Sequence, residues 1–328
     1  MIVVTGGAGF IGSNLVAGLE ARGVNELVVC DRLGQGDKWR NVAKREIADL
    51  VPPDRLLDYL DIHAREIECV FHMGAVSATT ERDVDLIMRE NFTLSLALWH
   101  WCARHGVRLI YASSAATFGD GAQGFDDDGS IGALERLRPL NAYGWSKHVY
   151  DRRVARLVDQ GDVVPPQWAG LKFFNVYGPN EYHKGTMKSV AAHIYPRAAR
   201  GEPARLFKSH RPDYADGGQL RDFVWVDDCV DVMLWLYDNT HVNGLFNVGT
   251  GAARSFADLA AAVFVALGRE PRIEFVDTPA EIRDKYQYFT QAEIGRLRAA
   301  GYGRQFMPLE AGVSTYVRDF LAAPDPYR

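Results

Sequence analysis

Thr5-Gly6-Gly7-Ala8-Gly9-Phe10-Ile11-Gly12 follows a short apolar run at the start of the chain and leads into a pattern typical of a helix. Each glycine has a physical role between a strand and a helix. Gly6 and Gly7 allow a tight turn, and Gly9 lets the backbone approach a pyrophosphate. Gly12 lets the helix pack closely on the strand, and the first N–H groups of that helix face the phosphates. The stretch therefore predicts a dinucleotide-binding turn.

Asp31 indicates how the adenosine end of the dinucleotide is bound. It stands nineteen residues after Gly12, at the end of the next predicted strand, where an acidic side chain binds the ribose hydroxyls. Arg32 and Lys38 follow at positions from which two cations can face a 2′-phosphate. An aspartate alone favours NAD, whereas an aspartate with two cations leaves NADP open. We predict NADP as the cofactor, with NAD as the alternative.

Tyr143 and Lys147 form a second informative pattern, Tyr143-Gly144-Trp145-Ser146-Lys147. Their spacing places both side chains on one face of a helix. A phenol with a pKa of about 10 is a poor base at neutral pH, but a nearby ammonium and a positive nicotinamide favour its phenolate form. Lys147 can also hold the nicotinamide ribose, and Ser114, at the end of an earlier predicted strand, would bind the reacting oxygen. The three residues predict hydride chemistry at a carbon that bears a hydroxyl.

Short apolar runs alternate with helical patterns through the first half of the chain. This alternation is typical of βαβ units and of a parallel sheet. We predict an α/β fold, a Rossmann-type doubly wound parallel sheet with a smaller mixed α/β substrate lobe. The predicted strands are 2–4, 26–30, 69–72, 109–113, 170–174, 223–226 and 245–248, and the predicted helices are 13–22, 84–105, 143–160, 228–239, 255–267 and 291–300.

The predicted lobes interleave along the chain, because no linker separates them. The expected NAD(P)-binding domain comprises 1–174, 222–250 and about 290–313, and the expected substrate-binding domain comprises 175–221, 251–289 and 314–328.

Composition excludes several classes of partner. A net charge of −5 and a pI of about 6.0 do not favour nucleic acid or an anionic membrane. The first strand starts directly after Met1 and no apolar run is long enough to span a bilayer, so we expect a cytoplasmic protein. Four widely spaced cysteines are expected to be buried free thiols. No metal is predicted, because neither His183 nor His193 has a carboxylate or cysteine at ligand spacing.

Three further features lie near the predicted path of the cofactor. Met73-Gly74-Ala75 follows a predicted strand, and such small residues at a carboxyl end let a cofactor pass over the sheet. His72, at the end of that strand, is interpreted as a core histidine. Asn91, in the following helix, is predicted to contact the ribose or to hold a structural water.

In this order, these residues resemble the extended short-chain dehydrogenase/reductase family. Most members act on nucleotide-activated sugars, as epimerases, dehydratases or decarboxylases. The resemblance covers nearly the whole chain and includes Asn175-Val176-Tyr177-Gly178-Pro179, Arg221-Asp222-Phe223-Val224-Trp225-Val226-Asp227-Asp228 and Phe246-Asn247-Val248-Gly249-Thr250-Gly251.

One branch of that family, the ADP-glyceromanno-heptose 6-epimerases, is more similar still. The resemblance implies a reaction that oxidises C6 of the heptose to a ketone with bound NADP and returns the hydride to the other face, in lipopolysaccharide core precursor biosynthesis. It implies Lys184 as a second base and a homo-oligomer, commonly a pentamer. The matching segments are Ser77-Ala78-Thr79-Thr80-Glu81, Glu181-Tyr182-His183-Lys184-Gly185-Thr186-Met187, Arg205-Leu206-Phe207 and Tyr286-Gln287-Tyr288-Phe289-Thr290-Gln291.

The family resemblance and the chemistry of these residues together define the predicted site, and the substrate contacts other than Ser114 are those that the resemblance implies. The predicted cofactor contacts are Gly6, Gly9, Phe10, Ile11, Gly12, Asp31, Arg32, Lys38, Met73, Gly74, Ala75, Val76, Ser77, Glu90, Asn91, Lys147, Val176 and Lys184. The predicted catalytic residues are Tyr143, Lys184, Ser114 and Lys147, and the predicted substrate contacts are Ser114, Asn175, Thr186, His193, Phe207, Lys208, Ser209, His210, Arg221 and Tyr286.

Two segments are longer than this family usually has. The first, 209–219, is a Gly/Asp/Pro-bearing stretch that we expect to be an exposed loop, and it weakens the assignment of Lys208, Ser209 and His210. The second, 120–138, contains three consecutive aspartates and is interpreted as a solvated loop.

Two alternatives stay open. A UDP-hexose 4-epimerase that uses NAD shares the glycine turn and the Tyr143/Lys147 pair but not the 181–187 segment. A non-catalytic dinucleotide-sensing regulator would usually have lost the tyrosine or the lysine, and both are present.

Overall fold

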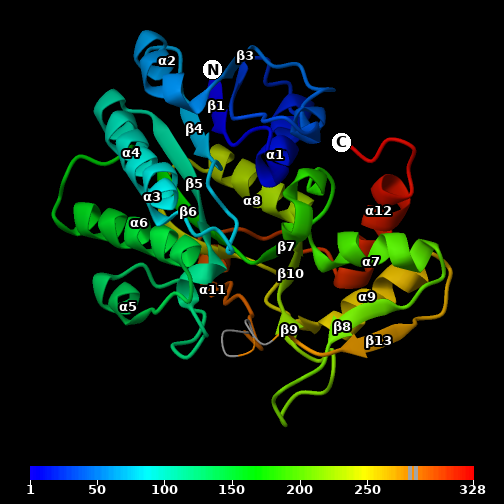
Figure 1. Cartoon of the computed structure of the whole chain (residues 1–328). Coiled ribbons are helices and arrows are strands. Elements are labelled where there is room, and N and C mark those ends of the chain that lie inside the picture. The colour runs from blue at the N-terminus through cyan, green and yellow to red at the C-terminus, as the bar shows by residue number, and fades with distance from the viewer. Residues whose placement is uncertain (280–282, 284–286) are drawn as a thin grey trace.

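A seven-stranded parallel sheet is the centre of the molecule (Figure 1). The computed structural model describes residues 1–279, 283 and 287–328. Every neighbouring pair of strands in the sheet is parallel, and the order is the one that characterises a doubly wound dinucleotide-binding fold, extended by one strand. From one edge to the other the strands are β11 (Gly244–Val248), β6 (Trp168–Phe173), β5 (Arg108–Ser114), β4 (Cys69–His72), β1 (Ile2–Thr5), β2 (Leu27–Cys30) and β3 (Asp49–Val51).

Strands β1, β2 and β4 are buried at every position because both faces of the sheet are covered. Val3 and Val28 lie in register and belong to one hydrophobic cluster, whereas Val4 and Val29 belong to the cluster on the opposite face. This alternation follows from the two-residue period of a strand. The predicted fold class is therefore confirmed.

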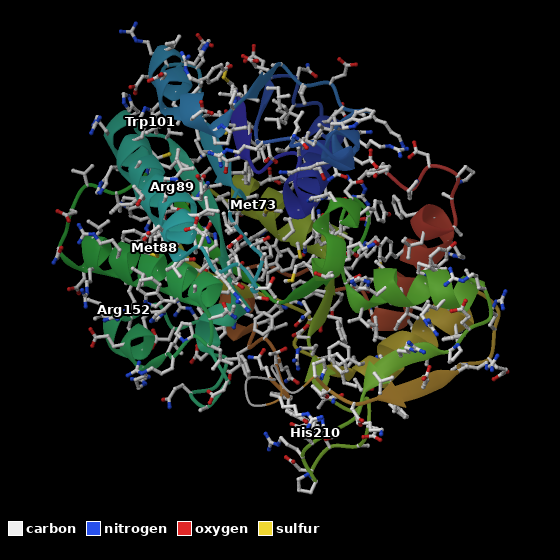
Figure 2. All side chains as sticks on the ribbon, viewed as in Figure 1. Met73, Met88, Arg89, Trp101, Arg152 and His210 are labelled. Carbon is white, nitrogen blue, oxygen red and sulfur yellow. The ribbon has the colours of Figure 1, made fainter. Side chains whose placement is uncertain are left out.

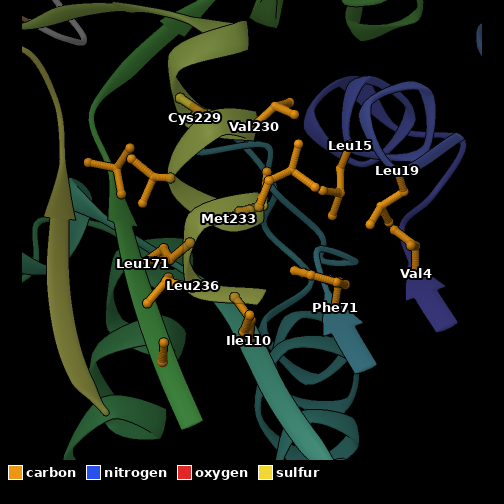
Figure 3. Close-up of a cluster of buried hydrophobic side chains, with 14 of the residues drawn as sticks. Val4, Leu15, Leu19, Phe71, Ile110, Leu171, Cys229, Val230, Met233 and Leu236 are labelled. Carbon is orange, nitrogen blue, oxygen red and sulfur yellow. The ribbon is translucent and has the colours of Figure 1, made fainter. Parts of the chain in front are cut away.

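Helices cover both faces of the sheet (Figure 1). On one face pack α1 (Phe10–Ala21) and α8 (Val226–Asp238). On the other pack α2 (Leu56–Ile62), α4 (Leu94–His105) and α6 (Ala142–Asp159). Figure 3 shows the first of these cores, in which the labelled side chains are Val4, Leu15, Leu19, Phe71, Ile110, Leu171, Cys229, Val230, Met233 and Leu236.

A third hydrophobic cluster lies beside the large sheet and is built from later segments of the chain (Figure 1). Its helices are α7 (Val190–Ala199), α9 (Phe256–Ala266) and α12 (Leu309–Tyr316). Its strands form pairs: parallel β7 (Asn175–Tyr177) with β10 (Phe223–Trp225), parallel β8 (Ala204–Phe207) with β13 (Ile273–Val276), and antiparallel β9 (Leu220–Arg221) with β12 (Arg254–Ser255).

Shorter elements connect these layers. They are α3 (Val84–Met88), α5 (Ile131–Arg136), α11 (Gly295–Ala299), the 3₁₀ turns η1 (Asp37–Asn41), η2 (Pro53–Arg55), η4 (Ala115–Phe118) and η5 (Tyr182–Met187), and the π turns η3 (Arg89–Thr93) and η6 (Val317–Leu321). The helix predicted over 84–105 is thus α3, η3 and α4 in succession, and the helix predicted over 291–300 starts only at Gly295.

The prediction of a solvated loop over 120–138 is wrong. Phe125 and Asp127 are buried, and the segment contains α5. The Asp127 carboxylate accepts the backbone N–H of Asn247 in β11 at 2.7 Å, and the Asn247 side chain donates to the Phe125 carbonyl at 2.7 Å. Burial raises the pKa of Asp127 to about 6. A run of aspartates looks solvated in sequence, but hydrogen bonds to a distant strand allow one of them to be buried.

The four cysteines, Cys30, Cys69, Cys102 and Cys229, are free and buried, as predicted. Across the described ranges, the structure contains no helix with the length and apolarity that a membrane span needs. The same residues include no group of three or more His, Cys, Asp or Glu side chains that could hold a metal ion.

Candidate active site

Two cavities that share lining residues run along the carboxyl ends of the central strands. Their volumes are about 280 Å³ and about 170 Å³. They meet where β1 lies between β2 and β4, which is the point at which the direction of chain winding reverses and where such sheets bind ligands. The residues that line both are Gly6, Asp31, Lys38, Gly74 and Ala75.

The glycine turn leaves no room for a side chain at Gly6 or Gly12. A Cβ added at Gly12 would lie 2.1 Å from the Gly6 carbonyl oxygen, and one added at Gly6, where φ is +63°, would lie 2.6 Å from Gly74 Cα. Helix α1 follows with Gly9 as its N-cap, and no side chain caps its first N–H groups. These N–H groups line a cavity and are available to a phosphate, so the turn fits the pyrophosphate of a dinucleotide.

The adenosine end of the cleft carries two acid–base pairs. The Asp31 carboxylate accepts the Ala8 N–H at 2.9 Å and the Lys38 ammonium at 2.5 Å. The Arg32 guanidinium donates to Glu90 at 3.0 Å. Both predicted cations therefore line the cavity beside carboxylates, where they can exchange these partners for groups on a ribose.

Ser114 and Tyr143 are brought together because α6 begins against the turn that follows β5. Asn141 caps α6 by accepting the Gly144 N–H at 2.8 Å. A Cβ at Gly144 would lie 2.6 Å from the Ala116 carbonyl oxygen, so this helix start packs directly on η4. Burial raises the pKa of Tyr143, and the Ser114 hydroxyl opposes that shift.

Lys147 lies one turn further along α6 and is 2% exposed. Its ammonium donates to the Ala112 carbonyl at 2.8 Å, beneath the same cavity. Burial lowers the pKa of Lys147 to about 8, and Asp151 opposes the shift. An ammonium here favours the phenolate form of Tyr143.

Lys184 lines the same cavity from a different element, the turn η5. Its ammonium lies 5.3 Å from the centroid of the Phe10 ring. Burial lowers the pKa of Lys184, and Glu181 opposes that shift. Glu181 is itself fully buried, and its carboxylate accepts the Ser189 hydroxyl at 2.6 Å and the Tyr316 hydroxyl at 2.9 Å. The cavity therefore contains two separate groups suited to proton transfer.

The other predicted cofactor contacts divide into lining and supporting residues. Asn91 lies behind the cleft, where its amide accepts the Val76 N–H at 2.8 Å and donates to Ser146 Oγ at 3.0 Å. His72 is a satisfied core histidine, as interpreted from the sequence, and burial lowers its pKa to about 3. The rest of the predicted cofactor set lines one or both cavities: Gly6, Gly9, Phe10, Ile11, Gly12, Asp31, Arg32, Lys38, Met73, Gly74, Ala75, Val76, Ser77, Glu90, Lys147, Val176 and Lys184.

Most of the predicted substrate contacts lie outside the two cavities. Figure 2 shows Met73 near the centre of the molecule and His210 far from it, on a protruding loop. Lys208 pairs with Asp277 at 3.0 Å, and the His210 N–H donates to the Tyr288 hydroxyl at 2.8 Å. The positions are Asn175 in β7, Thr186 in η5, His193 in α7, Phe207 in β8, Lys208, Ser209 and His210 in the following loop, and Arg221 in β9. Tyr286 lies outside the described residues.

The predicted site set omits several residues that line the two cavities, among them His183 and Phe174. Proximity along the chain was a usable signal for His183, which directly precedes Lys184. Phe174 follows a buried strand and had no such signal.

A Rossmann sheet, a glycine turn and a Ser/Tyr/Lys group in one cleft define a dinucleotide-dependent enzyme. Residues 2–249 match the family model described as the NAD dependent epimerase/dehydratase family. The chain belongs to this family.

Full-length relatives indicate one branch within this family. The chain is 50% identical over 333 residues to an ADP-L-glycero-D-manno-heptose-6-epimerase of Nitratidesulfovibrio vulgaris, with all of both chains covered. It is 45% identical over 335 residues to the Fusobacterium nucleatum protein of the same name, again with complete coverage. The resemblance to the heptose 6-epimerase branch is thereby confirmed.

Solved structures share the architecture. The Helicobacter pylori ADP-L-glycero-D-manno-heptose-6-epimerase has a TM-score of 0.80 at 26% identity, with 98% of this chain and 96% of that chain covered. The Thermus thermophilus UDP-glucose 4-epimerase in complex with NAD has a TM-score of 0.75 at 25% identity, with 98% and 99% covered. Structural similarity alone therefore does not distinguish heptose 6-epimerases from UDP-glucose 4-epimerases. The full-length sequence relatives make this distinction, because those named above are heptose 6-epimerases.

Proposed function

We propose that this protein interconverts ADP-D-glycero-D-manno-heptose and ADP-L-glycero-D-manno-heptose by epimerisation at C6, through a transient 6-keto intermediate, as a step toward the lipopolysaccharide core. The observation that carries the proposal is the presence of two proton-transfer groups, Tyr143 and Lys184, in one cavity. Inversion at a carbon requires help on both faces, because the oxygen of each epimer approaches from a different side. Full-length relatives that bear the name of this activity support the substrate.

Tyr143 acts on the oxygen at C6 in one orientation of the substrate. A bound nicotinamide would supply reversible hydride transfer at C6, so no net oxidation would occur. Tyr143 takes the hydroxyl proton when the epimer whose C6 oxygen faces it is oxidised, and it donates a proton to the ketone oxygen when that epimer is formed. Ser114 hydrogen-bonds the same oxygen, and the Lys147 ammonium stabilises the phenolate, which makes Tyr143 a base at neutral pH.

Lys184 performs the same exchange for the other orientation. A lysine serves as a base only when its amine is neutral, and burial lowers its pKa in that direction. The Phe10 ring and the buried Glu181 hold the turn that carries it. The keto intermediate must turn between the two groups before the hydride returns to its other face.

NADP is the proposed cofactor. Arg32 and Lys38 provide two cations at the ribose end of the cleft, and a 2′-phosphate would replace Glu90 and Asp31 as their partners. Lys38→Ala should weaken binding of NADP about 10-fold or more and change binding of NAD far less, because only NADP carries the phosphate. Isothermal titration with both cofactors measures this, and equal losses for the two would contradict the NADP proposal.

The remaining parts of the proposal concern the roles of the two lobes and the oligomeric state. Residues 1–174, 222–250 and about 290–313 would hold the cofactor, and 175–221, 251–289 and 314–328 would hold the ADP-heptose. Assembly as a symmetric homo-oligomer, commonly a pentamer in this branch, is carried over from the family resemblance. Analytical ultracentrifugation tests it directly.

The deciding experiment follows purified protein with ADP-D-glycero-D-manno-heptose, without added cofactor, by NMR of the C6 epimer ratio. Drift toward a mixture of epimers is expected, and in D₂O the product should carry no solvent deuterium at C6, because the hydride returns from bound cofactor. An unchanged ratio, with intact cofactor released on denaturation, would reject the heptose substrate. The UDP-hexose 4-epimerase alternative, which the Thermus thermophilus neighbour favours, would then be tested with UDP-glucose.

A further inference from the structure

Behind the Tyr143/Lys147 pair lies a fully buried ion pair that no step above uses. The Lys172 ammonium of β6 lies 2.6 Å from the Asp151 carboxylate of α6, and both side chains are 0% exposed. Ser113 Oγ donates to the same carboxylate at 2.7 Å. Buried ion pairs contribute little net stability, since desolvation offsets most of the attraction. Stability alone therefore does not explain these charges.

The ion pair is placed directly against the catalytic elements. Asp151 follows Lys147 by four residues and Tyr143 by eight, so all three lie on one face of α6. In the sheet, Ser113 lies opposite Lys172, one residue before Ser114.

A second connection runs through η4. The Lys172 ammonium donates to Thr117 Oγ1 at 2.8 Å, and Thr117 Oγ1 donates to the Ser114 carbonyl at 2.8 Å. The network of Asp151, Lys172, Ser113 and Thr117 thus joins α6, β5, β6 and η4, the elements that carry or support Ser114, Tyr143 and Lys147.

The surrounding titratable groups show which charge acts on Lys147. Asp151 opposes the effect of burial on the Lys147 pKa. Burial lowers the pKa of His72 to about 3 and of His148 to about 4, so both are neutral near pH 7. The groups that face this region are His72 on β4, Tyr111 on β5, Lys172 on β6, and Tyr143, His148, Tyr150, Asp151 and Arg152 on α6, with Arg138 from the segment before α6.

We propose that Asp151 is a positioning residue that keeps Lys147 protonated beside Tyr143, and that Lys172 limits this effect by neutralising part of the Asp151 charge. Asp151 lines neither of the two cavities of the candidate site, so in this proposal it acts through Lys147. The catalytic consequence of this inference rests on the proposed function, whereas the effect of Asp151 on the protonation of Lys147 does not depend on it. That lysine can be measured without substrate.

Removal of the Asp151 charge and removal of the Lys172 charge should shift the titration midpoint of Lys147 in opposite directions. Asp151→Asn removes the anion that opposes the effect of burial on Lys147, so the titration midpoint of Lys147 should fall by about one pH unit or more. Lys172→Met leaves the anion unshared, so the midpoint should rise from about 8. Asp151→Glu, which keeps the charge, should restore a midpoint close to that of the unmodified protein.

The experiment is an NMR titration of ¹³C-labelled lysine side chains in the protein with its bound cofactor, with Lys147→Arg used to assign the signal. If the network were purely structural, Asp151→Asn and Lys172→Met would both lower the melting temperature, and their Lys147 titration midpoints would not move apart. Midpoints that shift in the same direction, or not at all, would overturn the proposal. The high-pH limb of kcat/KM for epimerisation should follow the same order.

A double variant keeps the test valid if Asp151→Asn alone fails to fold. Asp151→Asn/Lys172→Met removes both buried charges, which proteins often tolerate. Compared with Lys172→Met, it differs only at residue 151, and its Lys147 midpoint should be lower. Ordered midpoints without epimerase activity would reject the proposed function and retain this inference. Epimerase activity together with Lys147 midpoints that do not follow the expected order would retain the proposed function and reject this inference.

Discussion

The two ends of the candidate active site are built in different ways. Tyr143 and Lys147 lie on the long helix α6, which packs against the sheet, and Lys147 is buried above a network of hydrogen bonds. Lys184 lies on the short turn η5, next to Gly185, whose φ of +56° and ψ of −123° are not helical. The tyrosine end is therefore held by a long helix against the sheet, whereas the Lys184 end is a short, partly exposed turn anchored through the buried Glu181.

The difference predicts how each end responds to change. A rigid end should lose nearly all function when its proton-transfer group is removed, because nothing can move in to replace it. A partly exposed turn should tolerate substitutions better, because water can reach the vacated position. The experiments below test this contrast in order of decreasing effect.

Tyr143→Phe should have the largest effect. Removal of the phenol should lower kcat for epimerisation by about 10²- to 10⁴-fold, because general acid–base catalysis at this end is lost. Bound cofactor should be retained and can be quantified after denaturation. Tyr150→Phe is the matched control, since it removes another phenol of α6 that donates to the Ser95 carbonyl instead of lining the cavity. Comparable losses in the two variants would point to damaged packing.

Lys184→Met should reduce kcat less, by about 10²-fold, the lower part of the range for a lost general base. NMR of the epimer ratio from each pure epimer measures the loss in both directions. Lys188→Met, which changes a lysine that follows the turn, is the control. Full activity of the Tyr143→Phe/Lys184→Met double variant would sink the assignment of two bases.

Two glycine substitutions compare the backbone elements that position Tyr143 and Lys184. Gly144→Ala places a Cβ 2.6 Å from the Ala116 carbonyl oxygen, so α6 must shift and Tyr143 with it. A Cβ at Gly185 meets nothing within 4 Å, and Gly185→Ala costs only backbone strain of about 1–3 kcal/mol in the turn. We expect kcat to fall more in Gly144→Ala. Steady-state kinetics beside thermal unfolding measure both terms, and the reverse order would contradict the contrast between the two ends.

The last prediction concerns stability instead of activity, at the buried residue His72. His72 has a pKa of about 3 in the folded protein, and about 6.5 is expected in the unfolded chain. Between these values the unfolded chain binds the extra proton, so the free energy of unfolding should decrease as pH falls, by about 1.4 kcal/mol per pH unit. His72→Asn should flatten this slope in urea unfolding, whereas exposed His100→Asn should not. An unchanged slope in His72→Asn would mean that His72 titrates normally.

Local patterns predicted the parts of the site that are local in the chain. The glycine turn, Asp31 and the Tyr143/Lys147 pair are each specified within a few residues, by a strand-to-helix turn or by one helical turn. The strand predicted over 69–72 is β4. Strands β3, β8 and β13 were missed because they are short and carry charged or exposed residues.

The resemblance to a family extended the prediction to Lys184, which no spacing rule would have selected. The substrate contacts that it implies on the loop after β8 stay predictions. The cavity does not include Lys208 or His210, and the loop that follows β8 stands away from it (Figure 2).

Residues 5–12 and 143–147 alone were sufficient to identify the class of enzyme, because backbone sterics and helical periodicity act over a few residues. The burial of Asp127 and the meeting of Asp151, Lys172 and Ser113 emerged only in the folded chain. Their partners are brought together by the register of β5 with β6 and by the packing of α6. Such contacts depend on which strands become neighbours, and a charged residue in a sequence carries no sign of the distant partner that will allow it to be buried.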